Sequence, residues 1–544
     1  MSGNEVITQE LCKDFDMKDG EMREFEVQGQ SVLLVRNNGV FSAVGNKCSH
    51  YGAPLSKGVL VGDRVRCPWH GACFNVRNGD IEEFPGLDSL PCFKITVENG
   101  SVYIVTSKKA LESTKRIKSM SSRCAGDRST VVIIGTGPSA LVCAETLRQE
   151  DYKGRIVLVT REKHVPYDRT KLSKAMNAKA VEIYLRSTEF YKEHDLEVWT
   201  EKEAVSVNTD EARVKFSDGS FLQYSQLLIA TGSRPRELKC PGSTLKNVFY
   251  LRCPEDANAI SEAATKKNVV IMGSSFIGME VAAFLADKAC SVSVVGKSDV
   301  PFQAVMGTQI GEVAMKLLME RGVKFYMRTE AREIQGNGGQ VKEVVLRNGT
   351  HLPADVVVAG IGVTPVSNFL KGSRVAVGIK GAIYVDQFMR TSVHDVFAAG
   401  DVVSFPLAMM DGHRANIGHW QMAHSHVFTA GGCCCLLRGR IAALNMLNKQ
   451  VPVTSVPFFW TSLLGKSIRY AGFGEGFTEI VIKGALEELK FLAFYLKDDI
   501  VVAVSSMNFD PIVSQVAEII FSGKRITKKE VLAEDFINVI GKLG

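Results

Sequence analysis

Two short Cys/His segments near the start of the chain carry the clearest chemistry. Cys48 and His50 form C-x-H, and after sixteen residues Cys67 and His70 form C-x-x-H. Two thiolates can hold one iron and two imidazoles a second iron, which is a ligand set for a [2Fe–2S] cluster. The alternative is a structural zinc site, since Cys₂His₂ also suits zinc, although zinc sites more often use C-x₂₋₄-C pairs. The spacing therefore favours the iron–sulfur cluster.

The context of these ligands indicates which kind of cluster it is. The segments CSHYGAPL and CPWHGACFNVRNGD are ligand loops in which a Gly follows each histidine, and the domain resembles a Rieske ferredoxin. Some Rieske proteins link the two loops by a disulfide. Here Ala53 stands where the first loop would carry its cysteine, so we expect Cys73 to be an unpaired packing residue. Histidine ligation raises the cluster potential to about −150 to +300 mV, which suits an electron relay that accepts electrons from a reduced flavin.

A glycine-rich turn at 135–140 follows the apolar run VVIIG and precedes a helical pattern. This G-x-G-x-x-A fingerprint predicts a dinucleotide pyrophosphate at a helix N-terminus. A second strand pattern ends at Thr160, and Glu162 is positioned to accept hydrogen bonds from ribose hydroxyls. The predicted FAD-binding residues of the turn are Gly135, Gly137, Pro138, Ser139 and Ala140.

Three later segments resemble the FAD-dependent pyridine nucleotide–disulfide oxidoreductases. They are PYDRTKLSK at 166–174, Ala230-Thr231-Gly232 and FAAGD at 397–401. The first segment points to the ferredoxin-reductase-like and apoptosis-inducing-factor-like members. The resemblance implies that Arg169 and Lys174 contact the flavin, that Lys174 lies near N5, and that Gly400 and Asp401 bind the ribityl or pyrophosphate region. No redox-active Cys pair lies between Cys143 and Cys240, which argues against a disulfide reductase.

A second fingerprint begins about 140 residues later and predicts a nicotinamide nucleotide site. Its predicted binding residues are Gly273, Ser275 (which replaces the second glycine of the fingerprint), Gly278, Glu280, Lys297 and, in a GIGVTP loop, Gly362. By resemblance Glu280 faces the nicotinamide; the alternative is a helix-surface carboxylate. Gly296 stands where NAD-selective folds place an acid, and Lys297 beside it favours a 2′-phosphate. We therefore expect NADPH to be tolerated or preferred.

The last third of the chain carries one candidate aromatic and one departure from the family. Trp460 matches an aromatic near the flavin ring in ferredoxin reductases; a core aromatic is the alternative. The segment 419–424 (HWQMAH) has the spacing of a helix laid over the flavin. Residues 427–438 (VFTAGGCCCLLR) interrupt this helix. We expect an inserted surface loop that breaks the helix, with a metal-binding Cys tract as the alternative.

The order of the expected strands and helices along the chain predicts a multidomain fold. Hairpin signals at Asn37-Asn38-Gly39 and Asn99-Gly100 indicate an all-β first domain. Two βαβ patterns indicate two α/β Rossmann-like units, and strands followed by a helix indicate an α+β C-terminal domain. The predicted boundaries are 1–106 Rieske domain, 107–129 basic linker, 130–265 and 390–452 FAD-binding domain, 266–389 NAD(P)-binding domain, and 453–544 C-terminal reductase domain. This order most closely resembles the Rieske-containing apoptosis-inducing-factor-like family.

The overall charge and composition of the chain argue against several classes of protein. The net charge is +6 over 544 residues, and nothing indicates nucleic-acid binding. The linker holds seven Lys or Arg against Glu112 and Asp127; it is expected to be a solvated, flexible segment, with an acidic partner or a membrane surface as alternatives. No secretory or transit pattern and no transmembrane stretch is found. The 13 cysteines lack a regular framework, which fits a reducing intracellular compartment; mitochondrial association and a pro-apoptotic role follow from resemblance alone.

The combined prediction is an oxidoreductase that passes electrons from NAD(P)H through FAD to the fused cluster and on to an unknown acceptor. Lys174 and Glu280 are the predicted catalytic residues, with Lys174 stabilising negative charge on reduced flavin. The flexible linker is expected to let the small domain swing. The rival functions are a signalling protein whose cofactors are mainly structural, and the donor component of an oxygenase system.

Overall fold

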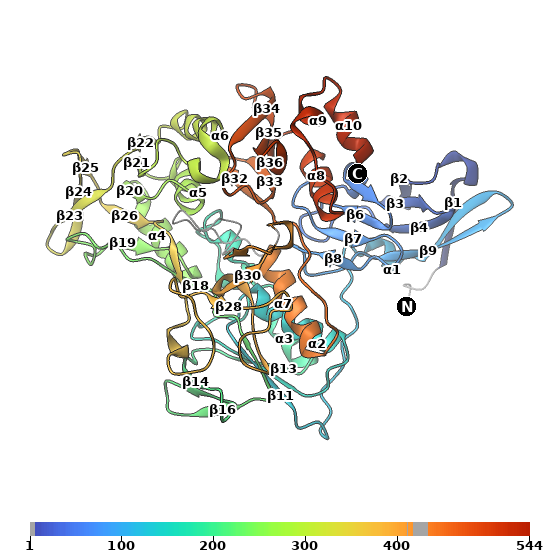
Figure 1. Cartoon of the computed structure of the whole chain (residues 1–544), viewed down its shortest axis with the longest axis horizontal. Coiled ribbons are helices and arrows are strands. Elements are labelled where there is room, and N and C mark those ends of the chain that lie inside the picture. Colours follow the sequence, from blue (N-terminus) through green and yellow to red (C-terminus); the bar gives the residue numbers. More distant parts are fainter. Residues whose placement is uncertain (1–5, 411, 417–432, 544) are drawn as a thin grey trace.

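The computed structural model describes residues 6–410, 412–416 and 433–543. Figure 1 shows an N-terminal β domain (blue) on the right and a C-terminal domain (red) at the top. Two α/β units fill the left and the lower centre. An all-β domain, two Rossmann-like units and an α+β C-terminal domain were predicted, and this fold class is confirmed.

The first domain consists of two antiparallel sheets. Both predicted hairpin turns are present: Asn38 and Gly39 have φ of 51° and 72°, and Asn99 and Gly100 have φ of 50° and 76°. Two successive positive φ angles match the right-handed twist of the strands that they connect. One sheet has the order β1-β10-β9-β4-β3-β2, and the small sheet β5-β6-β7-β8 carries the second ligand loop. The strands are β1 Val6–Lys13, β2 Glu21–Val27, β3 Gln30–Asn37, β4 Val40–Gly45, β5 Val59–Val61, β6 Arg64–Arg66, β7 Cys73–Asn75, β8 Ile81–Glu83, β9 Cys92–Glu98 and β10 Ser101–Ser107.

The basic linker is not the free tether that we expected. It begins with the short helix α1 Lys108–Glu112. Arg116 and Lys118 then pair with Asp80 of the first domain, at 2.5 and 2.7 Å. Farther along, the backbone N–H of Ser121 donates to the carbonyl of Arg148 in the first α/β unit. The expectation of a free, solvated tether is corrected, because acids on the folded domains pair with the linker's cations.

The first α/β unit is built on a parallel sheet of order β13-β12-β11-β17-β29. β11 pairs in parallel with β12, and α2 connects them as the βαβ pattern predicted. β29 comes from the region after residue 390 and pairs with β17. The elements are β11 Thr130–Ile134, α2 Pro138–Gln149, β12 Arg155–Val159, α3 Thr188–Glu193, β13 Leu196–Trp199, β17 Gln226–Ile229 and β29 Val396–Ala398, with smaller strands β14 Ala204–Asn208, β15 Arg213–Phe216, β16 Phe221–Gln223, β28 Ile383–Tyr384, β30 Val403–Pro406 and β31 Arg414–Ala415.

The second α/β unit repeats this design with the sheet order β19-β26-β20-β21-β22. The short strands β18 Ser233–Pro235 and β27 Val363–Pro365 pair where the chain crosses between the two units. The elements are β19 Val248–Tyr250, α4 Pro254–Ala264, β20 Asn268–Met272, α5 Phe276–Leu285, β21 Ser291–Val295, α6 Gln303–Met319, β22 Lys324–Tyr326, β26 Val356–Ala359 and the side sheet β23 Ala331–Asn337, β24 Gln340–Leu346 and β25 His351–Pro353.

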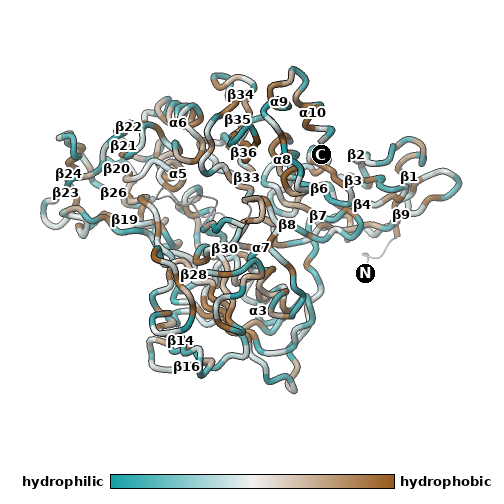
Figure 2. The backbone as a smooth tube through the Cα atoms, viewed as in Figure 1, coloured by the Kyte–Doolittle hydropathy of each residue, from teal (hydrophilic) through white to brown (hydrophobic). Residues whose placement is uncertain are grey.

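The C-terminal domain has one antiparallel sheet, of order β32-β33-β36-β35-β34, covered by helices. Figure 2 shows apolar segments gathered in the sheets, while the outer hairpin loops are mostly hydrophilic. Among the described residues, no helix combines the length and apolar composition needed to span a membrane. The elements are β32 Phe458–Leu463, β33 Lys466–Gly472, β34 Glu479–Ala485, β35 Lys490–Lys497, β36 Ile500–Met507, α8 Ile512–Phe521, α9 Lys528–Leu532 and α10 Phe536–Leu543.

Helix α7, Cys433–Met446, corrects the expectation for residues 427–438. The segment 433–438, expected to lie in a helix-breaking loop, forms the first turns of α7, directly after the Gly431-Gly432 pair. Leu436 and Arg438 are buried, and Arg438 Nη1 donates to the carbonyl of Gly400 at 2.9 Å. An apolar residue and a buried guanidinium anchor this turn, so Leu436 and Arg438 of the supposed insertion are part of the core. Residues 427–432 lie outside the described residues.

Buried ion pairs fix the N-terminal domain to the C-terminal domain. Arg66, which is 1% exposed, contacts Glu518 of α8 at 2.5 Å and Glu83 at 3.0 Å. The Ser514 hydroxyl of the same helix donates to the carbonyl of Cys67 at 2.9 Å. Because breaking a buried ion pair is costly, this interface holds the second ligand loop in one position.

A second ion-pair cluster fixes the N-terminal domain to the first α/β unit. Arg186 contacts Asp88 of the N-terminal domain and Glu145 of α2, each at 2.8 Å. All three side chains are 4–6% exposed. The ligand loops are therefore anchored from two sides, against two different domains.

Candidate functional site

The four predicted cluster ligands lie together at the tip of the N-terminal domain. Cys48 and His50 follow β4, and Cys67 and His70 occupy the turn between β6 and β7. Backbone hydrogen bonds hold both loops: the N–H of Cys48 donates to Ala53, and that of Cys67 donates to Ala72. Cys48 and Cys67 are 3% and 1% exposed, and the rings of His50 and His70 have centroids 5.0 Å apart. The thiols form the inner pair and the imidazoles the outer pair, as two irons with different ligands require.

The electrostatics of these residues fit a metal cluster. Burial lowers the pKa of His50 to about 4, so its imidazole is neutral at pH 7, the form that binds metal. Its Nδ1 atom is buried and has no hydrogen-bond partner among the described residues. A buried nitrogen without a partner is costly, and a metal ion satisfies it. Cys73 is free and fully buried, which agrees with a packing residue.

Trp460 of β32 stands directly against the imidazole pair. Its ring centroid lies 4.2 Å from that of His70 and 5.6 Å from that of His50. This aromatic lines the cavity that also holds the first fingerprint loop. The structure therefore puts Trp460 in the wall of that cavity, beside the cluster histidines, and the alternative of a plain core aromatic does not describe its position.

The cavity has a volume of about 410 Å³ and lies where β11 passes into α2. A Cβ atom added at Gly137 would meet nothing within 4 Å, whereas one at Gly135 would lie 2.2 Å from the carbonyl of Ala230. Gly135 thus permits the close turn, and Gly137 leaves the open space that a pyrophosphate needs. The hydroxyl of Thr136 is buried without a hydrogen-bond partner among the described residues. These features fit a bound dinucleotide.

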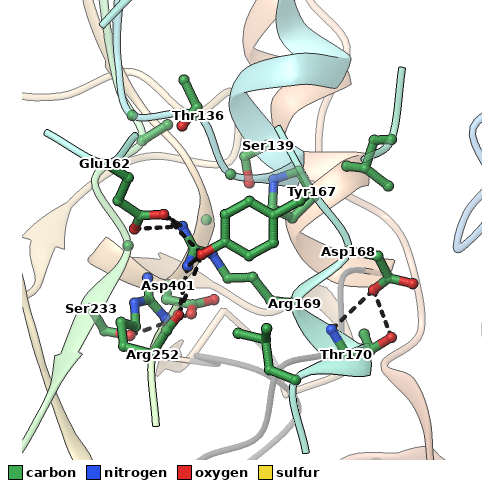
Figure 3. A pocket seen from close by; sticks show the side chains of 18 of the residues that line it. Thr136, Ser139, Glu162, Tyr167, Asp168, Arg169, Thr170, Ser233, Arg252 and Asp401 are labelled. Carbon is green, nitrogen blue, oxygen red and sulfur yellow. Dashed lines mark hydrogen bonds and ion pairs between the residues drawn. The ribbon is translucent and has the colours of Figure 1, made fainter. Parts of the chain in front are cut away.

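Charged side chains gather deeper in this cavity (Figure 3). Arg169 donates to both carboxylate oxygens of Glu162, at 2.8 and 3.0 Å. The Tyr167 hydroxyl donates to Glu162 at 2.8 Å. Burial acts to raise the pKa of Glu162, but the guanidinium groups of Arg169 and Arg252 lower it. The carboxylate is thus charged at neutral pH, and its two oxygens are held by Arg169 and Tyr167 in the cavity wall.

Most of the remaining predicted FAD contacts line the same cavity, but Ala140 is fully buried in α2 and Lys174 lines a neighbouring cavity instead. Asp401 accepts a long hydrogen bond of 3.4 Å from Ser233. Several lining residues had not been predicted, namely Ser49, Tyr51, Thr160, Ser233, Arg252 and Leu436. No sequence motif marks Arg252, which follows a three-residue strand, so only the assembled fold identifies it. The predicted residues that line the cavity are Gly135, Gly137, Pro138, Ser139, Glu162, Arg169, Ala230, Thr231, Gly232, Gly400 and Asp401.

Lys174 and Glu280, the two predicted catalytic residues, contact each other. Nζ of Lys174 lies 2.7 Å from Oε2 of Glu280. Glu280 also accepts hydrogen bonds from Ser173 at 2.5 Å and from Thr461 at 2.8 Å. Its side chain is 1% exposed, so the alternative of a helix-surface carboxylate was wrong. One carboxylate therefore joins the first α/β unit, the second α/β unit and the C-terminal domain.

The second fingerprint loop is arranged for a nucleotide at α5. Ser275 occupies the N-cap position of this helix, but its buried hydroxyl has no hydrogen-bond partner in the described part of the chain. A Cβ atom at Gly296 would lie 2.4 Å from Oγ of Ser274, so any larger residue here would crowd that side chain. Lys297 is exposed and pairs with Glu330 at 2.5 Å. Gly362 and Ile277 line the first cavity. The segment 419–424 lies outside the described residues.

Comparisons with known proteins agree with this arrangement. Residues 129–426 match the model of the pyridine nucleotide-disulphide oxidoreductases, residues 8–94 match the Rieske [2Fe-2S] domain, and residues 458–537 match the reductase C-terminal domain. The family matches imply FAD, NAD(P)H and a [2Fe–2S] cluster as cofactors.

Full-length relatives and solved structures extend the likeness. Human apoptosis-inducing factor 3 is 49% identical over 97% of this chain and 86% of its own length. The ferredoxin–NAD(+) reductase subunit of a benzene 1,2-dioxygenase system from Pseudomonas putida is 30% identical over 70% of this chain and 89% of its own length. A ferredoxin reductase from Rhodopseudomonas palustris superposes with a TM-score of 0.71 at 27% identity, covering 77% of this chain and all of that structure. A covalent putidaredoxin reductase–putidaredoxin complex gives 0.70 at 27% identity, covering 77% and 99% of the two chains.

These matches support an NAD(P)H-dependent flavin oxidoreductase of the ferredoxin-reductase type that carries its own Rieske domain. The chain belongs to the pyridine nucleotide-disulphide oxidoreductase family and, within it, to the Rieske-containing group that includes apoptosis-inducing factor 3.

Proposed function

We propose that this enzyme passes electrons from NAD(P)H through FAD to its own Rieske cluster without any movement of the domains, and from the cluster to an external acceptor. When bound, FAD would supply hydride-accepting and single-electron-donating chemistry, and a [2Fe–2S] cluster would supply a one-electron carrier. The chain's own residues bind these groups and hold them within reach of one another.

The proposal rests on one observation: residues of the flavin site and residues of the cluster site line the same cavity. The fingerprint loop at 135–139 and Asp401 form one part of its wall, and Ser49, His50 and Trp460 form another. A cluster ligand thus faces the space where the flavin ring is expected. The ion pairs of Arg66 and Arg186 keep it there, so the resting structure is already competent for transfer.

We assign roles to the predicted residues accordingly. Cys48, His50, Cys67 and His70 bind the irons. Gly137, Ser139 and the N-terminus of α2 bind the FAD pyrophosphate. Lys174 provides positive charge where negative charge develops on the reduced flavin, and Glu280 positions Lys174 through their 2.7 Å contact. Trp460 provides the aromatic path from the flavin to the imidazoles.

Coenzyme choice is proposed to rest on the loop after β21. No carboxylate occupies position 296, so the usual acceptor for the 2′-hydroxyl of NADH is missing. Lys297 is held by Glu330, and a 2′-phosphate can compete for it. We therefore expect NADPH to be used at least as well as NADH. A comparison of kcat/KM for the two coenzymes tests this expectation. A strong preference for NADH would contradict the role of Lys297.

The acceptor and the cellular role are separate questions. The names of the relatives suggest two possibilities: supply of electrons to an oxygenase system, and an apoptotic role, which by resemblance places the protein at mitochondria. The rate at which NAD(P)H reduces cytochrome c or ferricyanide through this protein distinguishes the two roles. Rapid turnover supports an electron-transfer enzyme, whereas bound cofactors with negligible turnover support a signalling protein.

The route itself is tested by electron paramagnetic resonance of anaerobic holoprotein frozen after mixing with NADPH. We expect the Rieske signal to appear in the unmodified protein and to form at least tenfold more slowly in Trp460→Leu. Phe221→Leu is the control, because Phe221 of β16 is 64% exposed and does not line this cavity. Equal rates in all three proteins would remove Trp460 from the path.

A further inference from the structure

The second ligand loop, which carries Cys67 and His70, lies against the C-terminal domain. The Ser514 hydroxyl of α8 donates to the carbonyl of Cys67 at 2.9 Å. Nε of Arg469 in β33 donates to the carbonyl of Trp69, also at 2.9 Å. The first donor is neutral, whereas the second is a cation. A guanidinium thus contacts the peptide group that joins Trp69 to His70, and none of the functional assignments above uses it.

Two neighbours fix the place of Arg469. It is the cross-strand partner of Trp460, the aromatic residue whose ring centroid lies 4.2 Å from that of His70. Its Nη1 atom lies 3.1 Å from Oδ1 of Asp510. The side chain of Arg469 is 10% exposed and that of Asp510 is 28% exposed. The cation is therefore held in the interior, and its carboxylate partner is nearer to the solvent.

Arg66 also contacts this loop, but its charge is balanced. Its Nη1 atom donates to the carbonyl of Gly71 at 2.9 Å, while Glu83 and Glu518 lie 3.0 and 2.5 Å from the guanidinium and are buried with it. Among the described residues, Arg469 has one carboxylate within ion-pair distance, and that carboxylate is partly exposed. Because solvent screens an exposed charge more than a buried one, a net positive electrostatic field remains at the loop beside Arg469.

This field acts on the electron affinity of a cluster bound at the loop. Reduction adds one negative charge to a [2Fe–2S] centre, and the groups around the ligands tune its reduction potential. A cation held nearby stabilises the reduced form, and it does so more strongly in the protein interior than in water. We infer that Arg469 raises the reduction potential of the cluster and that Asp510 limits this increase.

The inference rests on the proposed function for the identity of the cluster ligands, and it adds the C-terminal domain to the cluster site. Arg469 is a positioning residue, since it contacts the backbone of the ligand loop and is not itself a ligand. A higher potential favours the passage of an electron from reduced flavin to the cluster. The C-terminal domain thereby influences the direction of electron flow, besides holding the loop in place.

The test is a potentiometric titration of the purified holoprotein with chemical mediators, in which electron paramagnetic resonance measures the reduced cluster. Arg469→Gln should lower the midpoint potential by an amount equal to about a tenfold change in the reduction equilibrium, or about 59 mV for one electron. Asp510→Asn should raise the potential, because the cation then loses its counter-charge. Arg469→Lys keeps the charge and should retain most of the unmodified value.

Two controls separate charge from support of the loop. Ser514→Ala removes the neutral hydrogen bond to the carbonyl of Cys67 and changes no charge. Arg321→Gln removes an exposed cation that pairs with Asp287 in the second α/β unit. Both variants should move the midpoint potential far less than Arg469→Gln does. Iron and acid-labile sulfide are measured on every sample, so that each potential refers to an intact cluster.

Opposite shifts in Arg469→Gln and Asp510→Asn support the inference. Unchanged potentials, a fall in both variants, or equal shifts in Arg469→Gln and Ser514→Ala would show that Arg469 is a structural support and would overturn it. If Arg469→Gln does not retain iron, the direction of the shift in Asp510→Asn decides. Unmodified protein without a Rieske signal after reduction by dithionite would instead overturn the proposed function, and this inference with it. Because the mediators bypass NAD(P)H and FAD, failure of the electron route alone leaves these potentials unaffected.

Discussion

The Lys174 ammonium and the Glu280 carboxylate lie 2.7 Å apart, although they are 106 residues apart in the chain. Lys174 belongs to the flavin motif and Glu280 to the helix of the second fingerprint. Both were predicted from separate motifs, and their contact is the point at which the two nucleotide-binding units meet. A carboxylate buried at such a junction needs all of its donors.

Glu280→Gln should destabilise the junction. Glutamine keeps the shape, but it offers one acceptor oxygen where Ser173, Lys174 and Thr461 now donate to two. Leaving buried partners unsatisfied costs about 1–3 kcal/mol. We expect a lower melting temperature and a slower hydride transfer to the flavin, measured by calorimetry and stopped-flow absorbance. The exposed Glu211 pairs with Arg213 at the surface, and Glu211→Gln should change neither quantity.

Glu518→Gln should loosen the N-terminal domain. Arg66 would lose the charge that it contacts at 2.5 Å while remaining 1% exposed, and breaking such a pair costs about 3–5 kcal/mol. We expect trypsin to cut the basic linker faster and the cluster to be reduced more slowly. The control is Asp287→Asn, which removes the exposed pair with Arg321. Equal proteolysis of the two variants would mean that the buried pair does not anchor the domain.

The pKa of Glu83 predicts how the free energy of unfolding depends on pH through the interface between the N-terminal domain and α8. Burial acts to raise its pKa, but Arg66 and Arg64 lower it below the ordinary value of 4.5. A carboxylate whose pKa is lower in the folded state stabilises the fold fully above the unfolded value and loses this effect as the pH falls through the folded value. The difference in unfolding free energy between the unmodified protein and Glu83→Gln should be constant from about pH 8 to 5 and shrink below about 4.5. Urea denaturation across this range measures it, and a difference that grows at low pH would contradict the assignment.

Arg438 should control the retention of FAD. Its guanidinium donates to the carbonyl of Gly400 and lies over the ring of Phe405, 4.9 Å from the centroid. Gly400 and Asp401 line the flavin cavity. Arg438→Met should therefore lower the flavin-to-protein ratio after gel filtration, whereas Arg440→Met, at a half-buried position of the same helix, should not. Unchanged flavin content in Arg438→Met would separate α7 from the cofactor site.

Local patterns predicted the parts of the site that lie close together in the chain. The spacing of Cys48, His50, Cys67 and His70 specifies a ligand set, and the fingerprint at 135–140 specifies a strand, a turn and a helix. Each depends on a few neighbouring residues with restricted conformations or ligand chemistry. The same holds for both Asn-Gly hairpins.

The relations between domains could not be predicted in this way. Arg66 and Glu518 are 452 residues apart, and nothing near either residue indicates that the other is its partner. The sequence indicated a solvated linker because the basic residues lie close together in it. The acids that pair with them, such as Asp80, lie in other parts of the sequence. The start of α7 was misjudged for a similar reason, since the burial of Leu436 and Arg438 depends on α2 and Gly400.

The central claim is that the flavin and the cluster exchange electrons within one rigid molecule. The direct measurement is the rate of cluster reduction after anaerobic mixing with excess NADPH, at protein concentrations that differ by a factor of about thirty. We predict a first-order rate that does not change with protein concentration. A rate that rises in proportion to the protein concentration, or a flavin that is reduced while the cluster stays oxidised, would contradict the account.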